Sequence, residues 1–239
     1  MGSVYGPNMV TDDLVLALDA TNVQSYPGSG STWYNLAGTQ NTTLYNSPTH
    51  STSNGGYLQF NGSTQYADTN MFLVDDITWS LWHSVEDTNT NRILDVTSWN
   101  SSSTDFFEFK MTDAYNTNDI EQWAYSYVGG SRADFHTGTN ASHRGVDIWT
   151  NTVVAIGGGL GYTYQDGVNL GSDSAFFKAF TGASGQFAFQ LARARFYYLN
   201  GAAWQYGKTK ISMFNVWHKR LSDAEVLQNF NAHKSRFSL

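Results

Sequence analysis

An alternation of apolar and polar residues with a period of two constrains this fold more than any other feature of the sequence. It recurs in ITWSLWHSV (77–85), DFFEFKM (105–111) and EQWAYSYV (121–128). Successive side chains of a strand point to opposite faces of a sheet, so this pattern predicts half-buried β-strands. We expect the buried face of these strands and their neighbours to include three tryptophans: Trp33, Trp79 and Trp123.

Turn signals separate these runs at short intervals. The strongest lies in YTYQDGVNLG, because an Asp-Gly pair adopts the positive φ values of a type I′ hairpin turn. No helical segment long enough for a parallel crossover lies between the strands, so the pattern predicts an antiparallel jelly-roll β-sandwich. Without a linker or a repeat, residues 1–239 are expected to form a single domain. The turn pairs are Asn61-Gly62, Gly129-Gly130, Asp166-Gly167 and Asn200-Gly201.

The segment RLSDAEVLQNFN (220–231) is the one clear helix signal. Ser222 and Glu225 have the spacing of a capping box, in which each side chain accepts a hydrogen bond from the backbone of the other. A short helix of about three turns is therefore expected near the end of the chain. Its apolar residues are Leu221 and Val226, which form a hydrophobic staple, followed by Leu227 and Phe230.

The composition and the N-terminal sequence exclude several classes of protein. The chain has no Cys, which excludes disulfides and thiolate metal sites. The N-terminal residues lack a basic segment, and their apolar run, 14–18, is too short for a signal peptide or a membrane span. Aromatic residues make up 15% of the sequence, which suits a pleated, half-buried surface.

The charge is unevenly distributed. Residues 1–173 contain 18 carboxylates and 4 basic side chains, whereas residues 174–239 contain 9 basic side chains and 2 carboxylates. No carboxylate occurs between Asp173 and Asp223. A basic face of this kind fits an acidic partner surface or a polyanionic glycan, or it holds Lys and Arg residues that protect strand edges.

Four segments, in order, resemble laminin-G-like domains of the concanavalin A-like lectin/glucanase superfamily. They are LVLALDATNVQSYPGSGSTWYNLAG, YLQFNGSTQYAD, YTYQDGVNLG and the strand that leads into RLSDAEVLQNFN. The second is similar to that family's phenylalanine-turn-tyrosine hairpin. The loop SYPGSGSTWYNL and the tail HKSRF are similar to domains of bacteriophage virion proteins, cyanophages in particular. The resemblance implies a β-sandwich that acts on a virion surface.

The sequence departs from that family at positions that matter for metal binding. Asn35, Asn61 and Gln65 stand where relatives often carry Asp. Pentraxin-like relatives bind calcium through carboxylates before the last strand, and the corresponding segment, ARARFYYLNGAAWQYGKTK, contains none. Calcium takes six to eight oxygen ligands, usually with carboxylates among them, so no calcium site is expected here.

Catalytic patterns are also missing. Glucanases of this superfamily place two carboxylates on one strand as E-x-D-x-E, and none of the four glutamates has that spacing. The segment DTNTNR (87–92) begins like a calcium loop but lacks its glycine, and His136 and His143 match no metal spacing. The Gly-rich stretch 157–161 lies between predicted strands and is expected to be a turn. We therefore expect no enzymatic activity, metal or cofactor.

Binding remains as the expected activity. Trp99, and Trp204 with Tyr206, stand out from the core pattern because they occur in polar segments predicted to be loops. Arg193 and Arg195 are close in sequence to the latter pair. Such aromatic residues cover a core, stack on a sugar ring, or anchor a protein contact together with Arg.

The residues and the resemblance together predict a non-enzymatic bacteriophage virion protein, a capsid decoration or fibre component. Its expected partners are other virion proteins and surface glycans, with neither nucleic-acid binding nor membrane insertion. The alternative is a carbohydrate-binding module that acts away from any virion.

Overall fold

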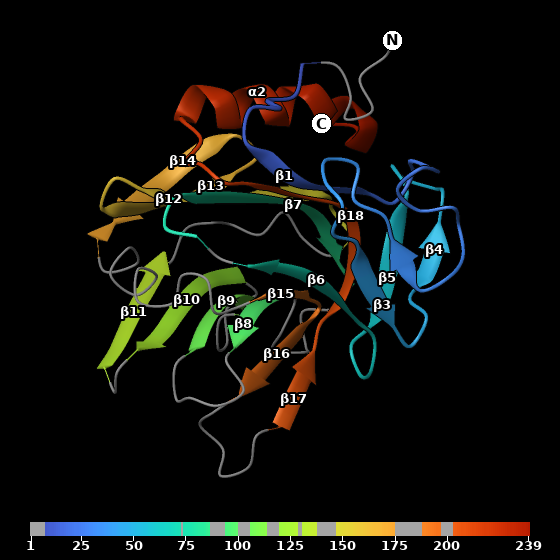
Figure 1. The fold of residues 1–239 in the computed structure, drawn as a ribbon, viewed down its shortest axis with the longest axis horizontal. Coiled ribbons are helices and arrows are strands. Elements are labelled where there is room, and N and C mark those ends of the chain that lie inside the picture. Colours follow the sequence, from blue (N-terminus) through green and yellow to red (C-terminus); the bar gives the residue numbers. More distant parts are fainter. Residues whose placement is uncertain are drawn as a thin grey trace.

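The computed structural model describes residues 8–72, 74–86, 94–99, 106–113, 120–128, 131–137, 147–174, 188–196 and 203–239. Two antiparallel sheets pack face to face, and a C-terminal helix lies on the outer face of one of them (Figure 1). The predicted all-β antiparallel sandwich with one short C-terminal helix is confirmed. No helix in these ranges is long and apolar enough to cross a membrane.

The first sheet, here called sheet A, has eight strands. Its last strand in sequence, β18, pairs with β7 along one side and with both β5 and β1 along the other, so the two ends of the chain meet in one sheet. The order across sheet A is β14 (Val168–Asp173), β13 (Leu160–Gln165), β12 (Thr150–Gly157), β7 (Ile77–Val85), β18 (Lys208–Trp217), β5 (Tyr57–Asn61) and β4 (Thr49–Ser51), with β1 (Leu14–Asp19) beside β18.

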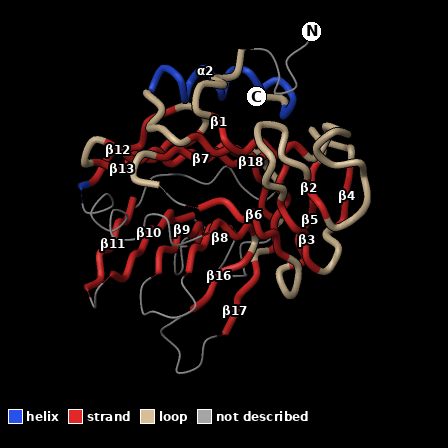
Figure 2. The backbone as a smooth tube through the Cα atoms, in the orientation of Figure 1, coloured by secondary structure: helices blue, strands red, loops and turns tan. Residues whose placement is uncertain are grey.

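Sheet B also has eight strands, and a separate two-stranded hairpin extends from it (Figure 2). The order across sheet B is β11 (Ser131–Thr137), β10 (Ile120–Val128), β9 (Phe106–Asp113), β8 (Leu94–Trp99), β15 (Ala188–Leu191), β6 (Tyr66–Phe72), β3 (Thr42–Tyr45) and β2 (Thr32–Trp33). The hairpin consists of β16 (Arg193–Phe196) and β17 (Ala203–Tyr206) and directly follows β15.

The main core lies between the two sheets. Trp79 of sheet A packs against Phe189 of sheet B, with ring centroids 5.3 Å apart. Trp33 and Trp79 are fully or almost fully buried, as their alternation predicts. Trp123 belongs to a strand whose side chains lie outside the description, so its burial stays a prediction.

A second apolar layer lies between sheet A and the helix α2 (Asp223–His233), which is followed by the 3₁₀ helix η1 (Lys234–Phe237). Every residue of β7 is buried, although its sequence alternates. The reason is that one face of β7 meets the core and the other lies under the C-terminal helices. Trp82, on this second face, stacks on Phe237 with ring centroids 4.2 Å apart.

The start of α2 follows its sequence signals closely. The predicted capping box is present, with Ser222 accepting a hydrogen bond from the Glu225 backbone and Glu225 accepting one from the Ser222 backbone. Leu221 and Val226 are both buried in one cluster, as a staple requires. The predicted apolar stripe is wrong at Leu227, which is 46% exposed. That residue lies at the edge of the contact face, where its Cδ1 is beside Gly167 of the β13–β14 turn.

Two predicted turns are found, and one connection differs. Asp166 and Gly167 join β13 to β14 with φ values of 51° and 79°, and Gly158-Gly159 turns between β12 and β13. The segment 57–68, predicted to be a hairpin, is instead a connection between sheets, because β5 belongs to sheet A and β6 to sheet B. The turns at 129–130 and 200–201 and the loop 87–92 lie outside the described residues.

Candidate functional site

The outer face of sheet B differs from that of sheet A, which α2 and η1 cover. Along β6, Ala67 and Thr69 are buried in the core, whereas Tyr66 and Asp68 alternate with them and point outward. Tyr45 of β3 and Gln190 of β15 have the same outward parity, because Tyr45 is the register partner of Tyr66 and Gln190 that of Asp68. Three neighbouring strands thus present these side chains on one face.

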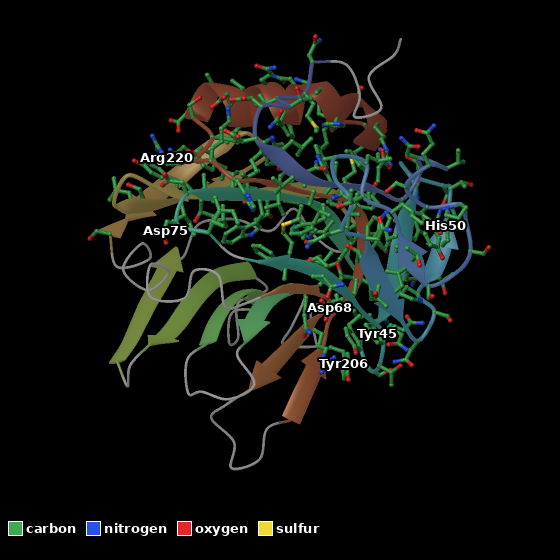
Figure 3. All side chains as sticks on the ribbon, in the orientation of Figure 1. Tyr45, His50, Asp68, Asp75, Tyr206 and Arg220 are labelled. Atoms are coloured by element: carbon green, nitrogen blue, oxygen red, sulfur yellow. The ribbon has the colours of Figure 1, made fainter. Side chains whose placement is uncertain are left out.

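An aromatic stack dominates this part of the face. The rings of Tyr45 and Tyr66 are parallel to within 4°, with centroids 4.3 Å apart. The Cζ atom of Arg193 lies 4.1 Å from the centroid of the Tyr66 ring. The ring centroids of Tyr66 and Tyr206 are 6.2 Å apart. We call these four residues the Tyr–Arg stack. Tyr45 and Tyr206, both labelled in Figure 3, each have a ring contact with Tyr66.

The two ends of the stack are not equivalent. Tyr66 is covered on one face by Tyr45 and over the other by the Arg193 guanidinium. Tyr45 stacks on Tyr66 and is still 39% exposed. A phenol ring with one open face offers a flat apolar surface with a negative π face, and a polar tip.

Polar groups adjoin the stack. The Gln190 side-chain amide donates a hydrogen bond to Asp68 Oδ2 at 3.2 Å, which fixes the orientation of both groups. Burial raises the pKa of the Tyr66 hydroxyl above its ordinary value, although the neighbouring Arg193 guanidinium acts in the opposite direction. The Tyr66 hydroxyl is therefore protonated at neutral pH.

The loop that follows Tyr45 is held rigidly by the 61–65 connection. Asn46 and Ser47 both have positive φ values, 60° and 53°. The Gln65 side-chain amide donates hydrogen bonds to both of their carbonyl oxygens, at 3.0 and 2.8 Å. The Asn61 side-chain oxygen accepts from three successive backbone N–H groups, which fixes the connection itself. Gln65 and Asn61 thus both form hydrogen bonds with the backbone.

The structure brings together four of the five residues selected from the sequence. Arg193 pairs with Tyr206, and Arg195 with Trp204, across the β16–β17 hairpin. The prediction that Trp204 and Tyr206 lie in a loop is wrong, because both belong to β17. Polar neighbours led to that error, although the segment AAWQY also alternates as an edge strand would.

Trp99 stands apart from these four residues. It ends strand β8 and does not lie in a loop. Leu191 pairs with Val96 in antiparallel register, so the chain runs on from β15 toward the beginning of β8. Trp99 is consequently at the end of β8 remote from the hairpin.

Sequence reasoning missed Tyr45, Tyr66, Asp68 and Gln190. The segments TTLY and YADTN do carry a signal, since Tyr45, Tyr66 and Asp68 all fall at the polar-facing positions of short alternating strands. Nothing local shows that β3, β6 and β15 are neighbours, however. The pairing of β6 with β15 joins strands more than 100 residues apart.

No group of three or more His, Asp or Glu among the described side chains is placed to hold a metal ion. The densest charged cluster contains its own cation: Lys210 Nζ lies 2.6 Å from Asp147 and 3.4 Å from Glu86. Burial lowers the pKa of Lys210, but the two carboxylates outweigh it and hold the pKa above its ordinary value. This cluster is therefore an ion-pair network and not a metal site.

The Asn35 side chain also forms hydrogen bonds with the backbone. Its side-chain oxygen accepts hydrogen bonds from the N–H groups of Ala17 and Ala37, and its amide donates to the Val15 carbonyl at 2.9 Å. Its polar atoms thus join β1 to the loop after β2.

Comparison with known proteins shows the fold. No protein-family model and no curated protein sequence matches the chain. Among solved structures, the chain is similar to domain 4 of AbnA, a GH43 extracellular arabinanase from Geobacillus stearothermophilus, in complex with arabinotriose. The TM-score is 0.63 and the identity 16%, over 91% of this chain and 98% of that one.

Two further similarities involve parts of larger chains. A Trypanosoma rangeli sialidase in complex with sialic acid matches with a TM-score of 0.61 and 13% identity, over 93% of this chain. The binding domain of Botulinum neurotoxin DC in complex with rat synaptotagmin II matches with a TM-score of 0.60 and 12% identity, over 93% of this chain and 52% of that one. The chain spans one third of the sialidase, 33% of its length. At these identities the likeness establishes a shared β-sandwich fold.

Proposed function

We propose that this protein is a non-enzymatic glycan-binding β-sandwich whose binding surface is the outer face of sheet B at the Tyr–Arg stack. The observation that carries the proposal is the Tyr45 ring, which stacks on Tyr66 and belongs to a side chain that is 39% exposed. Sugar rings bind to such surfaces through their C–H faces, and nearby amide or carboxylate groups bind the hydroxyls. The Asp68–Gln190 pair supplies those groups two residues away along the same face.

The fold is consistent with glycan binding, but it is not sufficient evidence for it. One structural neighbour, the arabinanase domain, was solved with arabinotriose, and a second, the sialidase, with sialic acid. A fold alone does not fix function. The argument therefore depends on the stack, which belongs to the residues of this chain.

The absence of catalysis is part of the proposal. Glycoside hydrolysis uses two carboxyl groups about 5–9.5 Å apart. None of the four glutamates in the sequence has the E-x-D-x-E spacing of the glucanases. We expect no release of reducing ends from any glycan that binds.

The test is a screen of immobilised neutral and acidic glycans with the full chain, its Tyr45→Ala variant and a Leu170→Ala control. Leu170 is 37% exposed on β14 of sheet A, so it matches Tyr45 in exposure but not in place. We expect Tyr45→Ala to weaken binding at least about tenfold, equivalent to about 1.4 kcal/mol, and Leu170→Ala to leave it unchanged. Equal loss in both variants, or binding by neither parent nor variants, would count against the proposal.

The virion surface stays the location predicted from the sequence. Its support is the likeness of SYPGSGSTWYNL and of the tail to virion domains. A glycan-binding surface on a capsid decoration or fibre protein would hold the phage particle near a cell whose surface carries that glycan. The virion location is tested by measuring the copy number of the protein in salt-washed phage particles relative to the major capsid protein. Hundreds of copies would indicate decoration, a handful a fibre, and none a free glycan-binding module.

A further inference from the structure

Two Asn-Gly pairs lie in the described part of the chain, and their asparagine side chains are held differently. Asn54-Gly55 lies in the turn between β4 and β5, and Asn61-Gly62 lies at the end of β5. An Asn-Gly pair is prone to loss of the side-chain amide, because glycine has no Cβ to hinder attack by its backbone nitrogen on the preceding side chain. The same reaction can therefore be compared in two settings.

The Asn54-Gly55 pair occupies the centre of a tight turn. The Gly56 N–H donates a hydrogen bond to the Ser53 carbonyl at 2.8 Å, and Asn54 and Gly55 have φ values of 48° and 84°. Positive φ at both central positions is typical of a type I′ turn. The Asn54 side chain is exposed and forms no hydrogen bond with another described residue. Its carboxamide can therefore turn toward the Gly55 nitrogen without losing such a bond.

The Asn61 carboxamide is held at both of its polar atoms. Its Oδ1 accepts hydrogen bonds from the N–H groups of Ser63, Thr64 and Gln65 at 2.9, 3.0 and 3.2 Å. Its Nδ2 donates to Thr64 Oγ1 at 3.2 Å. Rotation of this carboxamide toward the Gly62 nitrogen would break several of these bonds, so the reaction should be slower at Asn61.

Gly55 is the point at which the C-terminal tail contacts the β4–β5 turn. Its carbonyl oxygen accepts hydrogen bonds from Arg236 Nε at 2.6 Å and from Ser212 Oγ at 3.3 Å. A Cβ atom on Gly55 would lie 2.7 Å from Phe237 Cε1, so the Phe237 ring packs directly against the Gly55 backbone. A displacement of Gly55 would therefore disturb both the Arg236 hydrogen bond and the packing of Phe237.

We propose that Asn54 is a site of spontaneous deamidation and that isoaspartate formed there loosens the C-terminal tail. The Gly55 backbone nitrogen loses its proton to solvent as it bonds to Asn54 Cγ. The Cγ–Nδ2 bond breaks, and the nitrogen leaves as ammonia with a proton taken up from solvent, which leaves a succinimide. Water then opens the succinimide at either carbonyl and gives aspartate or isoaspartate at position 54.

The two products differ in their effect on the tail. Aspartate keeps the path of the main chain, and Asp is one of the residues that tolerate a positive φ. Isoaspartate carries the main chain through the former side chain and adds one carbon atom before Gly55, which shifts the Gly55 carbonyl away from Arg236. Isoaspartate should therefore loosen η1, whereas aspartate should not. This proposal is independent of glycan binding.

The rates are tested by incubating the full chain at mildly alkaline pH and mapping both Asn-Gly peptides by mass spectrometry. Labelling by protein isoaspartate methyltransferase distinguishes isoaspartate from aspartate. We expect Asn54 to react at least about tenfold faster than Asn61, because the reaction at Asn61 has to break hydrogen bonds. The matched control is Asn54→Gly, which removes the amide and keeps a residue suited to a type I′ turn. Reaction at Asn61 as fast as at Asn54 would overturn the proposal.

The effect on the tail is measured on the separated isoaspartate form. Its Tm should be about 4–8 °C below that of the unmodified protein, with faster amide exchange in η1 and unchanged exchange in β12 and β13. In an Arg236→Ala background the same modification should lower Tm by less, because the hydrogen bond to Gly55 is already lost. Asn54→Asp should keep the parent's Tm. An isoaspartate form with the parent's Tm and exchange in η1 would overturn the proposal.

Discussion

Arg236 and Asp19 form a two-fold hydrogen-bonded ion pair between the last turn of the chain and its first strand. Arg236 Nη1 donates to Asp19 Oδ2 at 2.8 Å, and Nη2 donates to Oδ1 at 2.7 Å. The side chains are 22% and 18% exposed. The Arg236 Nε also donates to the Gly55 carbonyl at 2.6 Å. This pair fixes η1 on sheet A and so holds the layer that covers the sheet's outer face.

Replacing Arg236 by Ala should lower the free energy of unfolding by about 3 kcal/mol, because it leaves the Asp19 carboxylate without its counter-charge and the Gly55 carbonyl with Ser212 Oγ as its remaining donor. Urea unfolding followed by Trp fluorescence measures the change. The double variant Arg236→Met with Asp19→Asn should recover part of the loss, since it removes the uncompensated charge. A single variant as stable as the parent would contradict the role given to this pair.

The contribution of this pair should depend on pH. Burial raises the pKa of Asp19, but the hydrogen bonds and charge of Arg236 and the Thr21 N–H outweigh it, so the pKa of this carboxyl in the folded protein lies below its ordinary value. A lowered folded pKa gives stability that is complete above the unfolded value and is lost as the pH falls through the folded one. The difference between the parent and Arg236→Ala should be constant between about pH 7 and 5 and shrink below about pH 4. An equal difference at pH 3 would contradict this assignment.

Phe237 should be a major stabilising residue of the tail. It stacks on Trp82 at 4.2 Å, its ring centroid is 4.9 Å from that of Trp149, and it is 6% exposed. Phe237→Ala should cost about 3 kcal/mol and change the Trp fluorescence spectrum. Leu227→Ala, at the edge of the contact face of the preceding helix and 46% exposed, should cost less than half as much. Similar costs for the two would mean that the tail does not pack as described.

The contribution of the α2 capping box to stability should be measurable with single substitutions at Ser222. Ser222→Ala removes the acceptor for the Glu225 N–H and should cost about 1 kcal/mol, a fall in Tm of about 2–4 °C. Ser222→Thr and Ser222→Asp keep a capping oxygen and should retain most of the stability. A Tm that does not change with Ala at this position would show that packing alone fixes the start of the helix.

The two tryptophans selected from the sequence should behave differently in glycan binding. Trp204 lies in the hairpin beside Arg195, so Trp204→Ala should weaken binding of the glycan identified in the screen at least about tenfold. Trp99 ends β8, about 17 Å along the strand from Leu94, so Trp99→Ala should leave the affinity for short oligosaccharides unchanged. Equal effects would place the ligand along β8 instead of at the hairpin.

Local sequence signals predicted the sandwich and its helix well. Alternation in β7, the Asp166-Gly167 turn and the Ser222–Glu225 capping box each depend on a few consecutive residues, so a single sequence is sufficient to find them. The same signals underestimated burial on the second face of β7. Ser80 and Thr78 read as solvent-facing, but they lie under the C-terminal helices, and Thr78 Oγ1 accepts a hydrogen bond from the Leu221 N–H.

The candidate site was found only in part, for a physical reason. Arg193, Arg195, Trp204 and Tyr206 are close in sequence, so composition alone brought them together. Tyr45 and Tyr66 join them through pairing of β3 with β6 and of β6 with β15, and no local pattern specifies those pairs. The segment 57–68 was predicted to be a hairpin for the same reason. The sequence of a turn between two strands does not indicate whether the strands belong to one sheet or to two.

The most direct test of the central claim is amide hydrogen exchange of the full chain with and without the tightest-binding glycan from the screen. Binding at the Tyr–Arg stack predicts slower exchange in β3, β6 and the β16–β17 hairpin, with α2 and β13 unchanged. Protection confined to α2 and the outer face of sheet A would contradict the account, because the ligand would then lie on the opposite side of the molecule.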